Sequence, residues 1–153
     1  MTDRTQRGPV STLNFNRELL AGEVGALVLA NVTAPAVSHF TRNATVISST
    51  AVAATLVGGS LSWIAARIHD RRRARNFSVG ALVGDLGYFT PAALCFGLGL
   101  YDPALFLISH DCLAHGAGAW LSVVAGQLAA FSLFLLALNA YRFSLFRFRG
   151  KAL

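Results

Sequence analysis

Four long apolar stretches limit what this chain can fold into. They cover about residues 19–40, 46–68, 77–101 and 120–141 of the 153-residue sequence. Each has the ~20 residues that a helix needs to cross ~30 Å of hydrocarbon. Only helices and closed barrels satisfy their backbone hydrogen bonds in lipid, and continuous rather than alternating apolar runs exclude a barrel. The sequence therefore predicts an all-α integral membrane protein with four helices packed as a bundle.

The composition agrees with a membrane protein. Charged residues make up 13% of the chain, whereas a soluble domain carries about a quarter. The net charge of +6 could suggest nucleic-acid binding. The basic residues, however, occur in short clusters between the apolar stretches and not along one face. We therefore expect membrane lipids, and no nucleic acid, as partners.

The positions of lysine and arginine predict how the helices are oriented. Three precede the first stretch, five lie between the second and third, four follow the fourth, and only Arg42 lies in a loop on the other side. Cytoplasmic loops carry the excess of positive charge. We expect an N-in, C-in protein of the inner membrane, with a cytoplasmic segment at 1–17, a transmembrane domain at 18–145 and a basic cytoplasmic tail at 146–153.

Two similar segments suggest that the four spans are two tandem α-hairpins. "LLAGEVGAL", residues 19–27, and "ALVGDLGYF", residues 81–89, each place an acid between two glycines. Aligning these acids superposes the first span on the third, and an arginine, Arg67 or Arg142, closes each hairpin on the same side. Parallel repeats of this kind occur in transporters. Short matches also arise by chance in sequence rich in glycine, alanine and leucine.

The two acids, Glu23 and Asp85, are the first candidate site residues. An acid at the centre of a membrane helix costs about 2.5–3.5 kcal/mol and usually has a function. Facing each other across the bundle, the two carboxylates would bind a cation or a proton, or neutralise a cationic group of a substrate. The alternative is structural: each acid pairs with an arginine near a helix end, such as Arg17, Arg67 or Arg142, or reaches the water layer on the inner side.

The segment between the third and fourth spans holds a second polar motif. Tyr101-Asp102-Pro103 predicts the end of the third span, followed by a short apolar helix over 104–108 and a polar turn. His110, Asp111, Cys112 and His115 are metal-ligand types. Only Asp111 and His115 would share a helix face, however, and zinc needs three or four ligands. We expect no metal here. No phosphate loop or dinucleotide-binding motif occurs in the sequence, so we expect neither an enzyme nor a cofactor.

The end of the fourth stretch, "LALNAYRFSLFRF", covers residues 136–148. It resembles the asparagine–arginine–aromatic helix ending of the GtrA-like family of small four-span membrane proteins, on Asn139, Arg142 and Phe143. That resemblance implies moving or presenting polyprenyl-phosphate-linked sugars during cell-surface polysaccharide synthesis. The first hairpin departs from the pattern because it lacks the matching asparagine, and the second outer loop is long.

Together these features predict a non-catalytic protein that translocates, or helps to translocate, an amphipathic or lipid-linked substrate. Four helices enclose little volume, so we expect a homo-oligomer or other membrane subunits as partners. The alternative is an accessory or assembly subunit of a respiratory, photosynthetic or oxidase complex. The expected substrate- or ion-binding residues are Glu23, Asp85, Arg67, Arg142 and Asn139. The expected lipid-headgroup residues are Arg71, Arg72, Arg73 and Arg75.

Reporter fusions test the predicted orientation. Alkaline phosphatase fused after residue 74 should be inactive, because that enzyme needs the oxidising side of the membrane and the arginine-rich connector should be cytoplasmic. The same reporter fused after residue 42 should be active. Phosphatase activity from the fusion after residue 74 would contradict the orientation.

Overall fold

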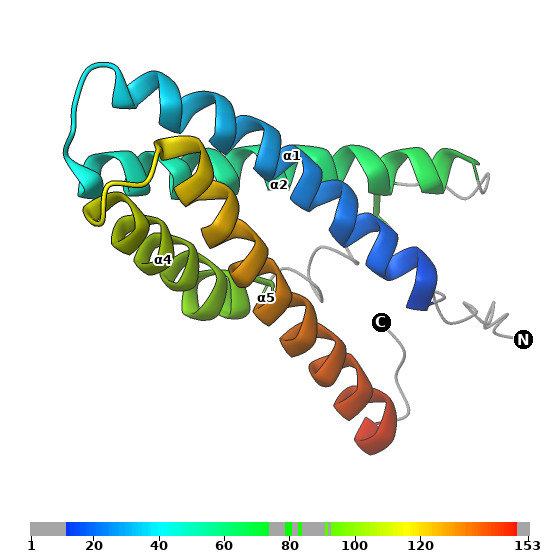
Figure 1. Cartoon of the computed structure of the whole chain (residues 1–153). Coiled ribbons are helices and arrows are strands. Elements are labelled where there is room, and N and C mark those ends of the chain that lie inside the picture. Colours follow the sequence, from blue (N-terminus) through cyan, green and yellow to red (C-terminus); the bar gives the residue numbers. More distant parts are fainter. Residues whose placement is uncertain (1–11, 74–78, 81–82, 84–90, 92, 150–153) are drawn as a thin grey trace, which may run out of the picture.

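The computed structural model describes residues 12–73, 79–80, 83, 91 and 93–149. In this part the chain is helical and contains no strand. Four of its helices are long and apolar enough to cross a membrane, so the prediction of an all-α chain with four candidate spans is confirmed. The helices are α1 (Thr12–Ser38), α2 (Ala44–Arg73), the π-helix η1 (Gly97–Tyr101), α4 (Asp102–Ala114) and α5 (Ala119–Arg149) (Figure 1).

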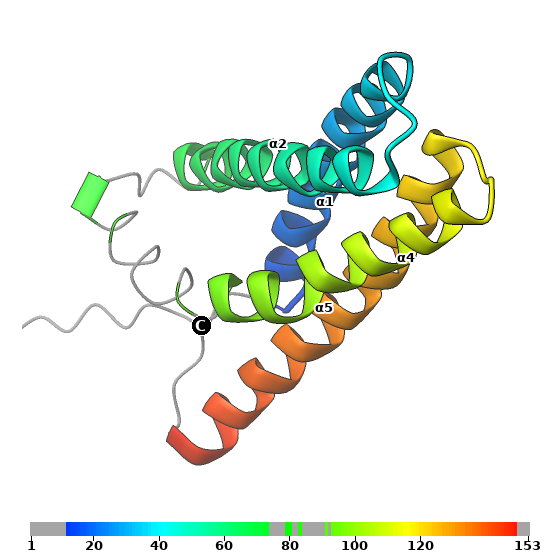
Figure 2. The ribbon, with the colours of Figure 1, turned by 90° about the vertical axis from the view of Figure 1, so that its left-hand side faces the viewer.

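The helices pack as two hairpins. α1 and α2 cross each other along most of their length, and α4 runs beside α5, which also contacts α1. The turns at 39–43 and 115–118 lie at the same end of the bundle (Figures 1 and 2). At the other end α2 and α5 point away from each other. The bundle is therefore closed at the end of the two turns and spread at the opposite end.

Local sequence explains both turns. The Asn43 side-chain oxygen accepts the backbone N–H groups of Thr45 and Val46, at 2.9 and 3.3 Å, which caps the start of α2. After α4 the chain turns at Gly116, whose φ of 86° is costly for residues with a side chain. The Gly116 N–H donates to the carbonyl of Leu113 at 3.0 Å, so the glycine closes the last turn of α4.

The sequence predicted that the third span ends at Tyr101, but the chain stays helical from Gly97 through Asp102 to Ala114. Asp102 has helical backbone angles, φ −63° and ψ −44°, and its N–H donates to the carbonyl of Gly97, the spacing of a π-turn. Pro103 then occupies the first turn of α4, where a missing N–H is tolerated. The described candidate span is Ala93–Ala114, so the segment expected as an outer loop is largely helical. Nearly half of the expected span at 77–101, including residues 84–90, lies outside the described residues.

Apolar packing occurs at three levels along the bundle. Near the turns, a cluster includes Ala34, Ile47 and Val123. Towards the spread end, Leu19 packs against Leu138. A third cluster joins Tyr101 and Leu105 of the third helix to Ala130 of α5, with Val52, Ala104, Phe131 and Phe134 around it. Tyr101 therefore enters the interior from a position that the sequence assigned to the membrane boundary.

The crossing of α1 and α2 depends on glycines. A Cβ built on Gly25 would lie 2.6 Å from the carbonyl oxygen of Gly58, and a Cβ on Gly58 would lie 2.9 Å from the Cβ of Leu29. Both distances are shorter than real Cβ atoms show. Helices in lipid associate through close backbone approach, because there is no hydrophobic drive between them. The glycines therefore determine how near α1 lies to α2.

Gly25→Ala tests this contact. The added methyl group must move one backbone, so we expect a loss of about 1–3 kcal/mol in the free energy of unfolding in detergent. Gly99→Ala is the matched control, because a Cβ there meets nothing within 4 Å in the described structure. That variant should be as stable as the wild type. Equal stability of both variants would show that the crossing tolerates a larger separation.

Candidate functional site

A glutamate and a tyrosine meet inside the bundle. The Tyr101 hydroxyl donates to the Glu23 carboxylate and lies 3.0 and 2.9 Å from its two oxygens. Tyr101 is 6% exposed, and its ring stands edge-on to Phe134 of α5, with centroids 5.8 Å apart. A hydrogen bond to an ionised group is stronger than a neutral one. The contact joins α1 to the third helix across 78 residues of sequence.

Neutral polar side chains continue from this contact towards the turns. Asn31 on α1 donates to the side-chain oxygen of Gln127 on α5 at 3.0 Å, and Gln127 donates to the hydroxyl of Thr55 on α2 at 3.3 Å. Gln127 is fully buried and also lies beside Tyr101. The polar network thus includes one side chain from each of the four candidate membrane-spanning helices, together with Glu23.

Asp102 is the second acid in this region. It is 8% exposed, and neither of its carboxylate oxygens has a hydrogen-bond partner within the described part of the chain. It directly follows Tyr101, at the junction of η1 and α4. Burying an ionised carboxylate without donors is costly, because no protein group replaces the hydrogen bonds that the carboxylate made with water. We therefore count Asp102 with Glu23 as a site residue that the sequence interpretation missed.

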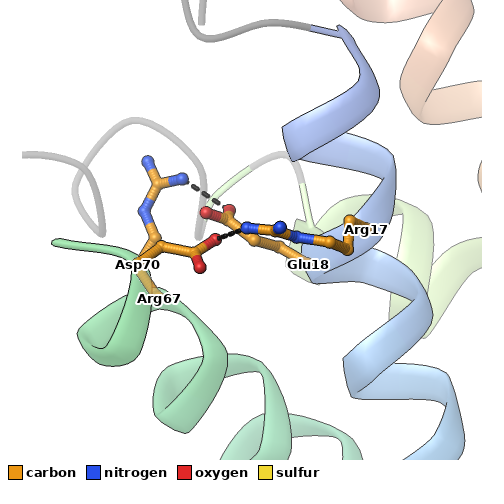
Figure 3. Close-up of polar contacts among 4 residues, drawn as sticks. All are labelled: Arg17, Glu18, Arg67 and Asp70. Atoms are coloured by element: carbon orange, nitrogen blue, oxygen red, sulfur yellow. Dashed lines mark hydrogen bonds and ion pairs between the residues drawn. The ribbon is translucent and has the colours of Figure 1, made fainter. Parts of the chain in front are cut away.

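Two ion pairs join α1 to α2 near their spread ends (Figure 3). Arg67 contacts Glu18 at 2.5 Å, with side chains that are 13% and 5% exposed. Arg17 contacts Asp70 at 2.5 Å, with side chains that are 59% and 23% exposed. Both pairs connect the first turns of one helix with the last turns of the other. Figure 3 shows the four side chains lying between the two helices.

The structural alternative, an arginine partner for each of Glu23 and Asp85, does not hold for Glu23 among the described residues. An arginine at a helix end, Arg67, does pair with an acid of the first span, but that acid is Glu18. Glu23 has Tyr101 as its partner and no ion pair within the residues that the structure describes. Glu18 directly precedes the apolar stretch at 19–40, where an acid indicates only the boundary of the membrane. Only the approach of α2 reveals its role.

The other predicted residues are distributed over several places. Asn139 on α5 donates to the side-chain oxygen of Asn16 on α1 at 3.3 Å and to its own helix at Leu135. Arg142 is half-buried one turn further along α5. Arg71, Arg72 and Arg73 form the last turn of α2 instead of a loop, where cations complement the helix dipole. Asp85 and Arg75 lie outside the described residues, so the expected pairing of Glu23 with Asp85 stays a prediction.

The polar motif at the end of α4 holds few contacts. His110 stacks on Phe106 one turn earlier, with ring centroids 5.7 Å apart. His115 lies 3.5 Å from a carboxylate oxygen of Asp111, and both side chains are 75% exposed. Among the described residues, no group of three or more side chains could hold a metal ion. The motif adds nothing to the site formed by Glu23, Tyr101 and Asp102.

Comparison with known proteins does not indicate a function. No family model, curated protein or solved structure matches this chain. The resemblance of residues 136–148 to the GtrA-like family therefore stays a prediction. What the protein does has to be inferred from the buried polar groups and from the charges at the helix ends.

Glu18→Gln tests the contribution of the buried ion pair. It removes the carboxylate from Arg67 in a largely buried place, so the free energy of unfolding should fall by about 3 kcal/mol. Arg17→Gln breaks the more exposed pair with Asp70 and should cost less than about 1 kcal/mol. Chemical unfolding in detergent measures both. Equal losses would mean that burial does not distinguish the two pairs.

Proposed function

We propose that this chain is a multi-pass protein of the inner membrane that translocates, or helps to translocate, an amphipathic or lipid-linked substrate. The observation that carries the proposal is the presence of two acids, the half-buried Glu23 and the buried Asp102, among helices that are long enough to cross a membrane. Ionisable residues inside a membrane are expensive and mark substrate or ion pathways by default. A bundle that served only as an anchor would gain nothing from them.

The proposed orientation is N-in and C-in, with two tandem hairpins. Its support is the separation of charge along the bundle. The arginines of the last turn of α2 and the two ion pairs lie at the spread end, opposite the turns at 39–43 and 115–118 (Figures 1 and 3). An arginine-rich end on the cytoplasmic side agrees with the positive-inside rule.

The two kinds of charge suggest separate roles. Arg71, Arg72 and Arg73 would hold an anionic headgroup or a phosphate at the level of the lipid headgroups, with Arg75 added from the sequence. Glu23, Tyr101 and Gln127 would supply hydrogen-bonding groups to a polar group that passes through the interior. Arg142 and Asn139, at the spread end of α5, would meet the substrate where it enters. Each of these roles requires binding and none requires catalysis.

An accessory subunit of a larger membrane complex is the second candidate function. It is favoured by Gly97 and Gly99 on the third helix, where a Cβ would meet nothing within 4 Å in the described structure. Glycines facing out of a membrane bundle allow another helix to approach closely. Purification in mild detergent followed by mass analysis separates the two functions. A self-oligomer supports translocation, whereas reproducible foreign subunits support the accessory role.

Lipid translocation in vesicles tests the main proposal. Vesicles of neutral and anionic phospholipid that contain the protein should flip a short-chain fluorescent phospholipid, or a fluorescent polyprenyl-phosphate sugar, faster than empty vesicles. Glu23→Gln and Tyr101→Phe should each lower that rate about tenfold, because each removes part of the polar contact inside the bundle.

Asp111→Asn is the matched control, since Asp111 is exposed and lies outside the site. Its rate should equal that of the wild type. Circular dichroism shows whether each variant keeps its helix content. Identical rates for wild-type and empty vesicles with both probes would refute the proposal, as would a folded Glu23→Gln variant with the wild-type rate.

A further inference from the structure

Asp102 is an acid on the packed face of α4. The residue is 8% exposed, and it shares that face with Leu105 and Ser109, which are fully buried. Positions 102, 105 and 109 are three and four residues apart, so they lie one above the other along a single side of the helix. The acid therefore occupies a position at which this helix otherwise carries interior residues.

The packing along this face is close. A Cβ built on Gly126 of α5 would lie 2.9 Å from the carbonyl oxygen of Leu105 and 3.4 Å from the backbone nitrogen of Ser109. The backbones of α4 and α5 thus approach each other about one turn beyond Asp102. Apolar side chains of α5 continue the contact as far as Tyr101, the residue before the acid. Asp102 therefore lies on the side of α4 that faces α5.

The carboxylate of Asp102 has no partner, and both of its oxygens are buried without a hydrogen bond in the described part of the chain. The other four described carboxylates each have a partner: Glu18 pairs with Arg67, Asp70 with Arg17, Asp111 with His115, and Glu23 accepts the Tyr101 hydroxyl. An isolated charge in such a place is so costly that the group usually takes up a proton instead.

Other titratable groups lie at different levels of the bundle. On α4 itself they follow Asp102 by eight residues or more, about 12 Å along the helix. On α5 they begin at Tyr141, whose ring meets Phe96, six residues before Asp102. On α2 they begin at Arg67, in the ion pair at the spread end. These groups are His110, Asp111 and Cys112 of α4, Tyr141, Arg142 and Arg147 of α5, and the charged and histidine side chains between 67 and 73 of α2.

Tyr101 is the titratable neighbour of Asp102 in the chain, and its hydroxyl is already used. It donates to Glu23 of α1, and a hydroxyl has one proton to donate. The π-turn Gly97–Tyr101 ends at Asp102 and places both of these adjacent residues in the interior. Such turns inside helices are frequent at functional sites. The tyrosine therefore serves Glu23, and the aspartate next to it remains without a donor.

A proton fits this place better than a metal ion does. Metal ions in proteins are held by several convergent ligands. Asp102 offers two oxygens, and no polar side chain of the described residues joins them. The described part of the chain contains no group of three or more His, Cys, Asp or Glu side chains that could hold a metal. A proton needs one carboxylate and no further ligand.

On the basis of the proposed function, we infer that Asp102 binds a proton in the packed bundle and gives it up to water when α4 and α5 separate during translocation. On release the O–H bond of the acid breaks, its electron pair stays on the carboxylate, and the proton joins water. The acid takes up a proton again when the helices repack. Uptake from one side of the membrane and release to the other would couple the proton gradient to the substrate.

Infrared spectra of the purified full-length protein in detergent test for the bound proton. At about pH 5 aspartates that are exposed to water are largely ionised. The wild type should nevertheless show the carbonyl band of a protonated carboxylic acid, and this band should be smaller in Asp102→Asn by the intensity of one acid. Asp111→Asn, which removes an exposed acid, should keep the full band.

Labelling the aspartate carboxylates with carbon-13 makes the same test without a substitution. Part of the wild-type band should shift, because it belongs to an aspartic and not to a glutamic acid. Circular dichroism shows whether Asp102→Asn keeps its helix content. The inference is overturned if the wild-type band does not shift with the label, or if folded Asp102→Asn keeps the full band.

A pH difference across vesicles tests the coupling. One proton carried across one pH unit is worth a factor of about ten, so the fluorescent probe should redistribute between the leaflets by up to about tenfold in the wild type. With Asp102→Asn the probe should stay evenly distributed, whereas Asp111→Asn should behave like the wild type. A wild-type distribution that ignores the pH difference would contradict the coupling.

The two measurements separate this inference from the function on which it depends. Probe translocation by a protein that lacks the Asp102 band would leave the proposed function standing and refute the proton site. The band in a protein that translocates neither probe would refute the function and leave the proton site standing.

Discussion

Close contact between α1 and α2 is the interaction on which the other features of this bundle depend. Backbone polar groups in hydrocarbon must bond within their own helix, and the helices then associate only through packing and polar contacts. Gly25 and Gly58 remove the side chains that would hold the two helices apart. The resulting approach brings Arg17 and Glu18 within reach of Asp70 and Arg67, although these pairs are separated by about fifty residues.

The same crossing determines which acids are neutralised. Arg67, near the end of α2, pairs with Glu18 at the spread end and not with an acid deeper in the bundle. Glu23, further along α1, meets the third helix instead, where Tyr101 donates a hydrogen bond. The charges are thereby divided into ion pairs with an excess of arginine at the spread end, and two acids, Glu23 and Asp102, that form no ion pair among the described residues. That division is the physical basis for proposing a pathway rather than a simple anchor.

The third helix shows where sequence reasoning was wrong and why. A tyrosine, an aspartate and a proline in succession usually end a helix, because proline lacks an N–H and restricts the residue before it. In this chain the π-turn of η1 shifts the hydrogen-bond register just before Asp102, and the helix continues to Ala114. Two polar residues expected at the membrane boundary are therefore buried. Local propensity contains no signal for a change in register that neighbouring helices stabilise.

Hydrophobicity and the spacing of charges were enough to predict an all-helical chain with four spans, because in lipid the length of an apolar run dictates its structure. They also singled out Glu23, since an acid inside such a run is conspicuous by itself. The partners of each acid depended on tertiary structure. Whether Glu23 meets an arginine, Asp85 or Tyr101 depends on the angle and separation of helices far apart in the chain, and a one-dimensional pattern does not encode these quantities. The importance of Asp102 came from its burial alone.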